Sequence, residues 1–371
     1  MIDRIFIDNF KSIRKLELKL NPVNVLIGSN GVGKTNFIGF FKLLNQIYAQ
    51  NLQTWIAQNG GANNILHFGL KNSDYLAGEI VFRDTDNRAT NKYIFKLKPN
   101  QNALIFEGED ELYNQEHTSV ISKNEKWRSS GYAYSNSNKE ESRLLTFQYC
   151  QFEYINSFFS NFAIYHFHDT SNTSKIKQSC NVNDNKMLKE DGSNLSAFLY
   201  FLQQKHPKNF SRIEAVIRSI APFFDRFDLA PDRLNEQYIQ LEWKEKGVPD
   251  MYLNAFNLSD GTLRMMALTT LLMQPNPPQT IIIDEPELGL HPFAINKLAG
   301  LLKKASTNSQ IIVSTQSTNL ISNFEPEDIV TVDRMGNQSV LKRLDTEGLD
   351  IWLEEYSLGE VWEKNLIGGR P

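Results

Sequence analysis

The sequence predicts an α/β fold with a mostly parallel core sheet, an antiparallel β subdomain and an inserted helical lobe. Three observations support this class. An apolar run at 23–27 enters a Gly-rich turn and continues into a helical pattern at 35–44. Strand-like stretches separated by Asp, Asn and Pro turns fill residues 75–113. The C-terminal third alternates strand and helix patterns, which is typical of a parallel sheet.

The N-terminal segment predicts a hairpin-like start that leads into a strand–loop–helix unit. Residues 2–10 have the composition of a strand, and residues 13–20 alternate apolar with polar side chains. The run at 23–27 is a short strand of the buried type, and the helix at 35–44 follows the Gly-rich turn.

The middle of the chain predicts an antiparallel meander followed by helices. Strands are expected at 78–82, 92–97 and 103–107. The stretch 114–141 is rich in Ser and Asn, which favours a mobile surface excursion. Residues from about 187 to 228 have a helical pattern, with Leu195, Phe198, Leu199 and Leu202 on one face and a further helix that ends before Pro222.

The C-terminal third predicts a strand at 281–283, a helix at 295–305 and a strand at 310–313. We therefore expect four ranges. The domain with the parallel sheet takes its N-terminal part from 1–84 and its C-terminal part from 235–345. An inserted lobe with the meander occupies 85–234, and a tail occupies 346–371.

Composition excludes several classes of protein. The 371 residues are 41% apolar and 22% charged, which suits a globular chain. The formal net charge of −4 offers no global positive field for nucleic acid or an anionic membrane. Cys150 and Cys180 are too few for a disulfide framework, and no apolar run has the length of a membrane span. We expect a cytoplasmic protein without a membrane partner.

A phosphate-binding loop is predicted at Gly28-Ser29-Asn30-Gly31-Val32-Gly33-Lys34-Thr35, which fits G-x-x-x-x-G-K-[ST] between a strand and a helix. Its glycines let backbone N–H groups turn toward phosphate oxygens, and the helix N-terminus adds its dipole. Lys34 would reach the β- and γ-phosphates, and the Thr35 hydroxyl would ligate Mg²⁺. ATP and Mg²⁺ are therefore the expected cofactors.

Two adjacent carboxylates, Asp284 and Glu285, end the apolar strand at 281–283. The carboxyl ends of parallel strands are where open α/β sheets bind ligands. We expect Asp284 to hold Mg²⁺ through water and Glu285 to orient the attacking water for displacement at the γ-phosphate.

The run Leu258-Ser259-Asp260-Gly261-Thr262 resembles the signature loop of ABC-type ATPases, Leu-Ser-Gly-Gly-Gln, although Asp260 and Thr262 depart from it. Ser259 and Asp260 are also ordinary helix-capping residues. The resemblance implies that Ser259 and Gly261 touch the γ-phosphate bound to a second protomer, with Ser259 acting in catalysis.

Further motifs are similar to the RecF, SMC and OLD-type branch of these ATPases. They are Asn9-Phe10-Lys11-Ser12, Asn30 in the phosphate loop, and Glu285-Pro286-Glu287-Leu288-Gly289-Leu290-His291-Pro292. The resemblance implies a nucleotide site with these contacts: Lys11, Gly28, Asn30, Gly31, Gly33, Lys34, Thr35, Asn36 and Gly261.

Gln316, in Ser314-Thr315-Gln316-Ser317, stands where the family usually carries a switch histidine. An amide donates a hydrogen bond but carries no imidazolium charge, which predicts slower turnover. The family's Q-loop glutamine, a further Mg²⁺ contact, is Gln148 or Gln151, with Gln148 favoured.

The resemblance implies an ATP-hydrolysing head that dimerises, or forms a higher homo-oligomer, around sandwiched ATP. Landmarks at 165–171, 191–195 and 352–362 look like stand-alone ATPases of bacterial defence islands. In that group the head is a sensor or motor subunit of an antiphage or DNA-maintenance complex, beside a separate nuclease-like effector. DNA stays open as a partner. The alternatives are a slow or non-hydrolysing scaffold that regulates a toxin-like effector, and a transporter cassette.

Two other signals leave alternatives open. His166 and His168 flank Phe167 on an expected strand, so they share a face that suits either a metal pair or hydrogen-bonded core histidines. Arg264 lies on the helix after the signature and would either contact phosphate or DNA or lie on a solvated face.

Overall fold

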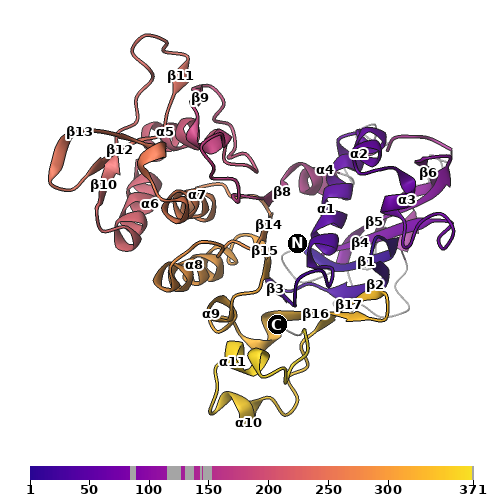
Figure 1. Ribbon diagram of the computed structural model, residues 1–371. Helices are drawn as coiled ribbons and strands as arrows, with labels where there is room; N and C mark the ends of the chain where they lie inside the picture. The colour runs from indigo at the N-terminus through magenta and orange to yellow at the C-terminus, as the bar shows by residue number, and fades with distance from the viewer. Residues whose placement is uncertain (84–88, 115–126, 130–137, 143, 145–152, 370–371) are drawn as a thin grey trace. The chain divides into compact units, whose positions relative to one another are not determined.

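The computed structural model describes residues 1–83, 89–114, 127–129, 138–142, 144 and 153–369. The chain divides into two compact units. The first unit comprises residues 1–162 and 325–371, and the second comprises residues 163–324. Figure 1 labels the elements of both units.

The first unit opens with the β-rich segment that the sequence predicts. Its elements before the second unit are β1 (Ile2–Phe10), β2 (Ile13–Lys19), β3 (Val23–Ile27), α1 (Lys34–Tyr48), α2 (Leu52–Gln58), α3 (Ala62–Ile65), β4 (Leu76–Arg83), β5 (Ala89–Asn100), β6 (Ala103–Asn114), β7 (Trp127–Ser129) and α4 (Glu153–Ser160). The expected hairpin and all three meander strands are confirmed, although the meander strands are longer than expected.

An antiparallel sheet with the order β2-β1-β4-β5-β6-β7 forms the body of this unit. Helix α1 packs on it through aromatic contacts (Figure 1). The Phe40 ring of α1 lies 5.5 Å from Phe10 of β1 and 6.1 Å from Phe95 of β5, measured between ring centroids. All three rings are fully buried, so the helix that follows the phosphate loop is anchored to the sheet.

The chain returns to the first unit through η4 (Pro326–Asp328), β16 (Ile329–Met335), β17 (Gln338–Arg343), α10 (Asp350–Leu353) and α11 (Leu358–Glu363). Strand β16 pairs in parallel with β3 and antiparallel with β17. Strand β3, which runs into the phosphate loop, is buried along its whole length. The last strands of the chain therefore support the first functional loop.

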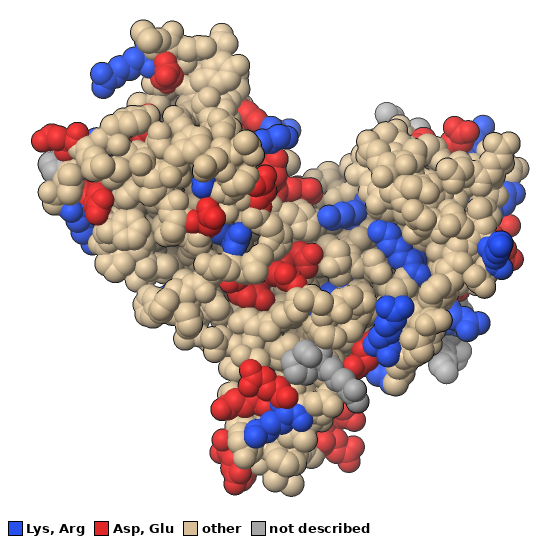
Figure 2. All heavy atoms as spheres, in the orientation of Figure 1, with Lys and Arg blue, Asp and Glu red and all other residues tan. Residues whose placement is uncertain are grey.

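Acidic side chains gather over the segment that carries α10 and α11 (Figure 2). The exposed carboxylates there include Asp345, Glu347, Asp350, Glu354 and Glu355. A surface of this sign repels nucleic acid.

The second unit contains the predicted helices and the βα alternation. Its elements are β8 (Phe162–Tyr165), η2 (Lys175–Lys177), β9 (Cys180–Asn181), α5 (Leu195–Lys205), α6 (Pro207–Ile220), β10 (Phe224–Phe227), β11 (Tyr238–Ile239), β12 (Glu242–Glu245), β13 (Val248–Asn254), η3 (Ala255–Asn257), α7 (Asp260–Met273), β14 (Thr280–Asp284), α8 (Pro292–Ala305), β15 (Gln310–Thr315) and α9 (Thr318–Ile321).

Parallel pairing of β14 with β15 confirms the sheet expected in the C-terminal third, with Asp284 opposite Ser314. The helices pack in sequence, α5 on α6, α6 on α7 and α7 on α8. In α5 the expected apolar face is buried, with Leu195, Phe198, Leu199 and Leu202 at most 4% exposed.

Two sequence expectations are wrong in this unit. The second helix ends at Ile220, before Pro222 as expected, but the helical pattern does not extend to residue 228, because residues 224–227 form β10, which pairs with β12. The expected strand through Phe167 ends at Tyr165, and His166 and His168 follow it outside any strand. The period-two argument for one shared face therefore does not apply.

The unit boundaries also differ from the expected ranges. Strand β4 lies in the expected range 1–84, and its partner β5 lies in the expected range 85–234. Their pairing places both strands in the first unit. Strand β10 lies in 85–234 and pairs with β12 in 235–345. Strand pairing, rather than composition, sets the boundaries. The expected excursion at 114–141 contains β7, and residues 115–126 and 130–137 of it lie outside the described residues.

Among the described residues, none of the helices combines the length and the apolar character that a bilayer crossing requires.

Candidate functional site

Backbone conformation shapes the phosphate loop between β3 and α1. Gly28, Gly31 and Gly33 have φ of 157°, 78° and 121°, a region that residues with a Cβ rarely adopt. A Cβ on Gly28 would lie 2.5 Å from the Val332 carbonyl oxygen of β16. A Cβ on Gly33 would overlap Ser339 Oγ of β17. Gly28 and Gly33 are required because the C-terminal strands pack directly behind the loop.

Lys34 points back into this loop from the first turn of α1. Its Nζ donates hydrogen bonds to Gly28 O and, at 3.0 Å, to Ser29 O, and the residue is 5% exposed. Thr35, next in the helix, is exposed. The loop therefore combines an enclosed ammonium, a helix N-terminus and an accessible hydroxyl, which is the donor set that a triphosphate and its Mg²⁺ require. Asn30 and Gly31 form the exposed tip of the loop.

The motif Asn9-Phe10-Lys11-Ser12 joins the loop through Ser12. Ser12 Oγ accepts a hydrogen bond from Asn36 Nδ2 of α1 at 2.7 Å and from Ser339 Oγ at 2.6 Å. Ser339 N also donates to Ser12 O at 2.8 Å. The sequence analysis missed Ser339, and no local signal marks it, because its partners are far away in the sequence.

Strained backbone surrounds Lys11 in the same motif. Asn9 and Lys11 have φ of 59° and 48°, a conformation that clusters at functional sites. Lys11 Nζ lies 5.6 Å from the ring centroid of Phe10 and 5.9 Å from that of Trp55. Burial, and then the nearby Lys42, lower the pKa of Lys11. The side chain lies along α1 beside Gly39, and its contact with phosphate stays a prediction.

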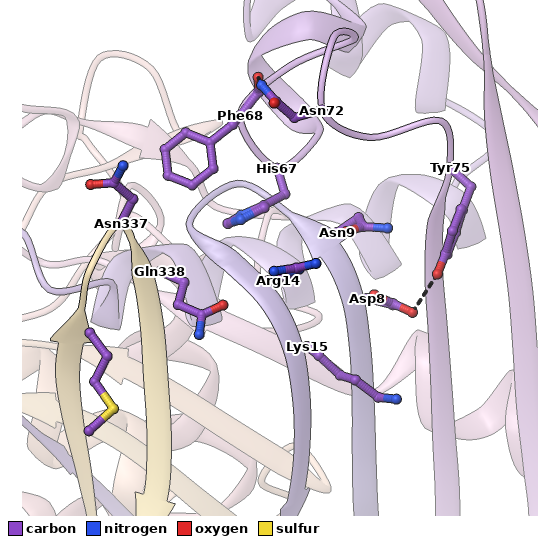
Figure 3. Close-up of a pocket in the computed structure, with 11 residues that line it drawn as sticks. Asp8, Asn9, Arg14, Lys15, His67, Phe68, Asn72, Tyr75, Asn337 and Gln338 are labelled. Atoms are coloured by element: carbon purple, nitrogen blue, oxygen red, sulfur yellow. Dashed lines mark hydrogen bonds between the residues drawn. The ribbon is translucent and has the colours of Figure 1, made fainter.

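A polar cavity of about 690 Å³ opens beside this motif in the first unit (Figure 3). Figure 3 shows Asn9, Arg14, His67, Phe68 and Asn337 around it. His67 Nδ1 lies 2.8 Å from Lys11 O, which ties the cavity wall to the strained turn. Local patterns do not reveal this cavity, because residues of β1 and β2, of the segment 67–75 and of the β16–β17 hairpin form it together.

In the second unit, Asp284 ends β14 and Glu285 follows it, as expected. Ser314 Oγ of β15 donates a hydrogen bond to Asp284 Oδ1. Glu285 N donates to Ser314 O at 3.0 Å, and Glu285 has a strained φ of 43°. The neighbouring strand thus orients both carboxylates at the carboxyl edge of the sheet.

Gln316 contacts one carboxylate of this pair, that of Glu285, and the carboxylate of Glu287. Its Nε2 donates a hydrogen bond to Glu285 Oε1, and its backbone N–H donates to Glu287 Oε1 at 3.2 Å. The structure therefore brings together Glu285 and Gln316, two of the predicted site residues.

Glu287 is the second residue that the sequence analysis missed as a functional group. Its Oε1 also accepts the Thr315 hydroxyl, and its Oε2 is buried without a hydrogen-bond partner among the described residues. Burial raises the pKa of Glu287, against the effect of the hydrogen bonds from Thr315 and Gln316, and Glu285 adds to the rise. Its carboxyl group holds the turn that carries Gln316. The sequence signal that could have identified Glu287 is its position two residues after Glu285 on a short turn.

The signature-like loop forms the N-terminus of α7. Ser259 caps the helix, with its Oγ accepting from Thr262 N at 3.2 Å, which confirms the ordinary capping interpretation of the local geometry. Ser259 is exposed, and Gly261 is half-buried. A Cβ on Gly261 would lie 2.5 Å from Gly289 O, so the signature turn packs against the loop that follows Glu285.

The solvated-face expectation for Arg264 is wrong. The residue is 5% exposed, and its guanidinium donates to Phe167 O at 2.9 Å and to His168 O at 3.1 Å. Burial lowers its pKa. Arg264 thus fastens the segment after β8 to α7, and its contact with phosphate or DNA stays a prediction.

Two further predictions concern the possible histidine metal pair and the Q-loop glutamine. The rings of His166 and His168 lie 6.2 Å apart, and no group of three or more His, Cys, Asp or Glu in the described part of the chain is arranged to hold a metal. Gln148, Gln151 and Cys150 lie outside the described residues. Mg²⁺ ligation by Thr35 and Asp284 stays a prediction.

The comparisons with known proteins agree with this geometry. Residues 23–322 match the family described as "AAA domain, putative AbiEii toxin, Type IV TA system". Over 118 residues the chain is 28% identical to ABC transporter A family member 11 of Dictyostelium discoideum, a match that covers 32% of this chain. The chain spans only 13% of that transporter's length.

Solved structures of Smc heads have a similar fold. The Smc head bound to the C-winged helix domain of ScpA has a TM-score of 0.60 at 15% identity, covering 94% of this chain and 99% of that one. A Smc head with an extended coiled coil, bound to the C-terminal domain of ScpA from Pyrococcus furiosus, has a TM-score of 0.56 at 14% identity, covering 95% and 98%. The match over residues 23–322 shows that the chain belongs to this AAA-domain family of ABC-type ATPases, and the likeness to the Smc heads shows a fold of the Smc-head type.

Proposed function

We propose that this ABC-type head binds Mg²⁺-ATP, dimerises around it and hydrolyses it. It would act as the sensor or motor subunit of a defence or DNA-maintenance complex. The hydrogen bond from Gln316 to Glu285 carries the proposal, because it links a switch turn to the carboxylate that would orient water. The glycine geometry and enclosed Lys34 of the phosphate loop support it from the other unit.

Each residue has a defined task in this proposal. Backbone N–H groups of the phosphate loop and Lys34 bind the phosphates, and Thr35 and Asp284 hold the metal ion. Bound Mg²⁺ would neutralise charge on the phosphate oxygens. Glu285 orients the water, and Gln316 keeps Glu285 in position. Phosphoryl transfer needs positioning and charge stabilisation more than covalent chemistry, so these groups suffice.

Dimerisation is proposed from the signature turn. Ser259 and Gly261 present a helix N-terminus, which favours an anion, and the γ-phosphate of a second copy is the anion that the family resemblance implies. The named Smc heads are bound to parts of ScpA, which supports a separate partner for this chain as well. The AbiEii wording of the family description supports a defence setting. We propose a nuclease-like effector as that partner.

A second candidate function is a slowly hydrolysing ATP-dependent scaffold. The Gln316 amide already engages Glu285 Oε1, so one oxygen of the proposed base is occupied. Neutral Gln316 also offers less charge to the γ-phosphate than an imidazolium would.

Hydrolysis and assembly measured together separate the two functions. We would measure ATP hydrolysis per monomer against protein concentration, and mass by light scattering with and without Mg²⁺-ATP, for the wild type, Glu285→Gln and the exposed control Glu355→Gln. Hydrolysis that rises with concentration and is lost only in Glu285→Gln supports the ATPase. ATP-dependent dimers without turnover in the wild type favour the scaffold. Absence of an ATP-dependent dimer refutes both.

A further inference from the structure

A buried lysine reaches the first turn of the signature helix. Lys177 ends η2, and its side chain is 5% exposed. Its Nζ lies 3.2 Å from Oδ1 of Asp260, the first residue of α7. Asp260 is the residue that stands where the ABC signature has its first glycine, so the departure from the motif and the buried cation form one pair.

Stability alone does not explain this pair. The Asp260 side chain is 63% exposed, and a carboxylate at a helix N-terminus is already stabilised by the helix dipole and by water. Burying an ammonium, in contrast, costs free energy unless it is well paired. The chain therefore buries a lysine beside an aspartate whose charge is already stabilised without it.

The other charged groups nearby do not take over this task. Arg264, in the next turn of α7, interacts electrostatically with Asp260, but its hydrogen bonds go to Phe167 O and His168 O. The pKa of Asp169 is lowered mainly by hydrogen bonds from Ser171, and the charge of Lys177 lowers it to a smaller extent. Lys177 is thus the cation that faces Asp260.

We propose that Lys177 neutralises Asp260 so that the signature turn, at Ser259 and Gly261, can accept the γ-phosphate of a second copy. The inference rests on the proposed ATP-dependent dimer. An uncompensated carboxylate on this turn would repel the phosphate, and Lys177 removes that repulsion without touching the nucleotide. Lys177 is a positioning residue in this scheme.

The test is a double-mutant cycle on ATP-dependent dimerisation in the Glu285→Gln background. Light scattering gives the ATP concentration for half-maximal dimer formation. Lys177→Met should raise it on the order of tenfold, the size expected for one unpaired charge at short range in a partly solvated site. Asp260→Asn should leave it near the wild-type value, and Lys177→Met with Asp260→Asn should restore it.

The chain offers a matched control two residues away. Lys175→Met removes a lysine whose side chain is 79% exposed and lies 4.0 Å from Asp191, and it should have no effect. Lys177→Arg should dimerise like the wild type, because it retains the positive charge. High salt should shrink the Lys177→Met defect by screening the repulsion, which a purely structural defect would not show.

Three outcomes overturn the inference, and they differ in meaning. If Lys177→Met dimerises like the wild type, Asp260 needs no compensation. If the double variant is as defective as Lys177→Met, Lys177 acts on the phosphate itself or only on folding. If the parent protein forms no ATP-dependent dimer, the proposed function fails and the inference fails with it.

Discussion

Gly261→Ala tests whether the signature turn is packed against the loop after Glu285. Gly261 is helical, so alanine would stabilise α7 by up to about 1 kcal/mol if space allowed, and by less in the first turn. The added Cβ would instead lie 2.5 Å from Gly289 O, a backbone atom that a rotamer change cannot move. Overpacking of this kind costs about 1–3 kcal/mol. We expect a net loss of about 1–2 kcal/mol in the free energy of unfolding.

Gly300→Ala is the matched control. Gly300 lies in α8, is exposed, and has no heavy atom within 4 Å of a built Cβ. The same substitution there should therefore stabilise the protein by about 0.5–1 kcal/mol. Urea unfolding followed by circular dichroism should move the two midpoints in opposite directions. A Gly261→Ala midpoint that rises with that of Gly300→Ala would refute the packing argument.

The remaining predictions concern Glu287 and Gly33. Burial raises the pKa of Glu287, so the native state holds its proton more tightly than the unfolded chain does, and this contribution to stability is lost as pH rises through the raised native pKa. Gln keeps an acceptor for Thr315 and Gln316, so Glu287→Gln should gain stability relative to the wild type as pH rises through that native pKa in urea unfolding; an unchanged difference contradicts the assignment. Gly33→Ala should weaken Mg²⁺-ATP binding about tenfold or more in calorimetric titration, because strained φ costs about 1–3 kcal/mol and its Cβ overlaps Ser339. Gly31→Ala, with positive φ but open space, should bind more tightly than Gly33→Ala; equal affinities would remove the role of Ser339.

Local patterns in the sequence determined the strands, the helices and the motif positions. The run at 23–27 and the Gly-rich turn after it are β3 and the phosphate loop, since spacing and glycine content are local properties. The alternation at 281–313 is the parallel β14–β15 pair with α8 between its strands. Asp284 and Glu285 end their strand where the motif predicts.

Tertiary structure decided the pairings that local patterns do not encode. Strand β10 was mistaken for helix because a short amphipathic segment takes its conformation from the strand beside it. A solvated face was the expectation for Arg264 on α7. The side chain is instead buried and donates hydrogen bonds to two carbonyl groups of a distant segment.

The support of each motif was equally hidden from the sequence. Ser339 holds Ser12 across more than 300 positions, Glu287 holds the turn of Gln316, and Lys177 meets Asp260. Motif spacing determined which groups could act on a nucleotide. Long-range packing decided how those groups are held, because a hydrogen bond or ion pair between distant segments exists only once the chain has folded.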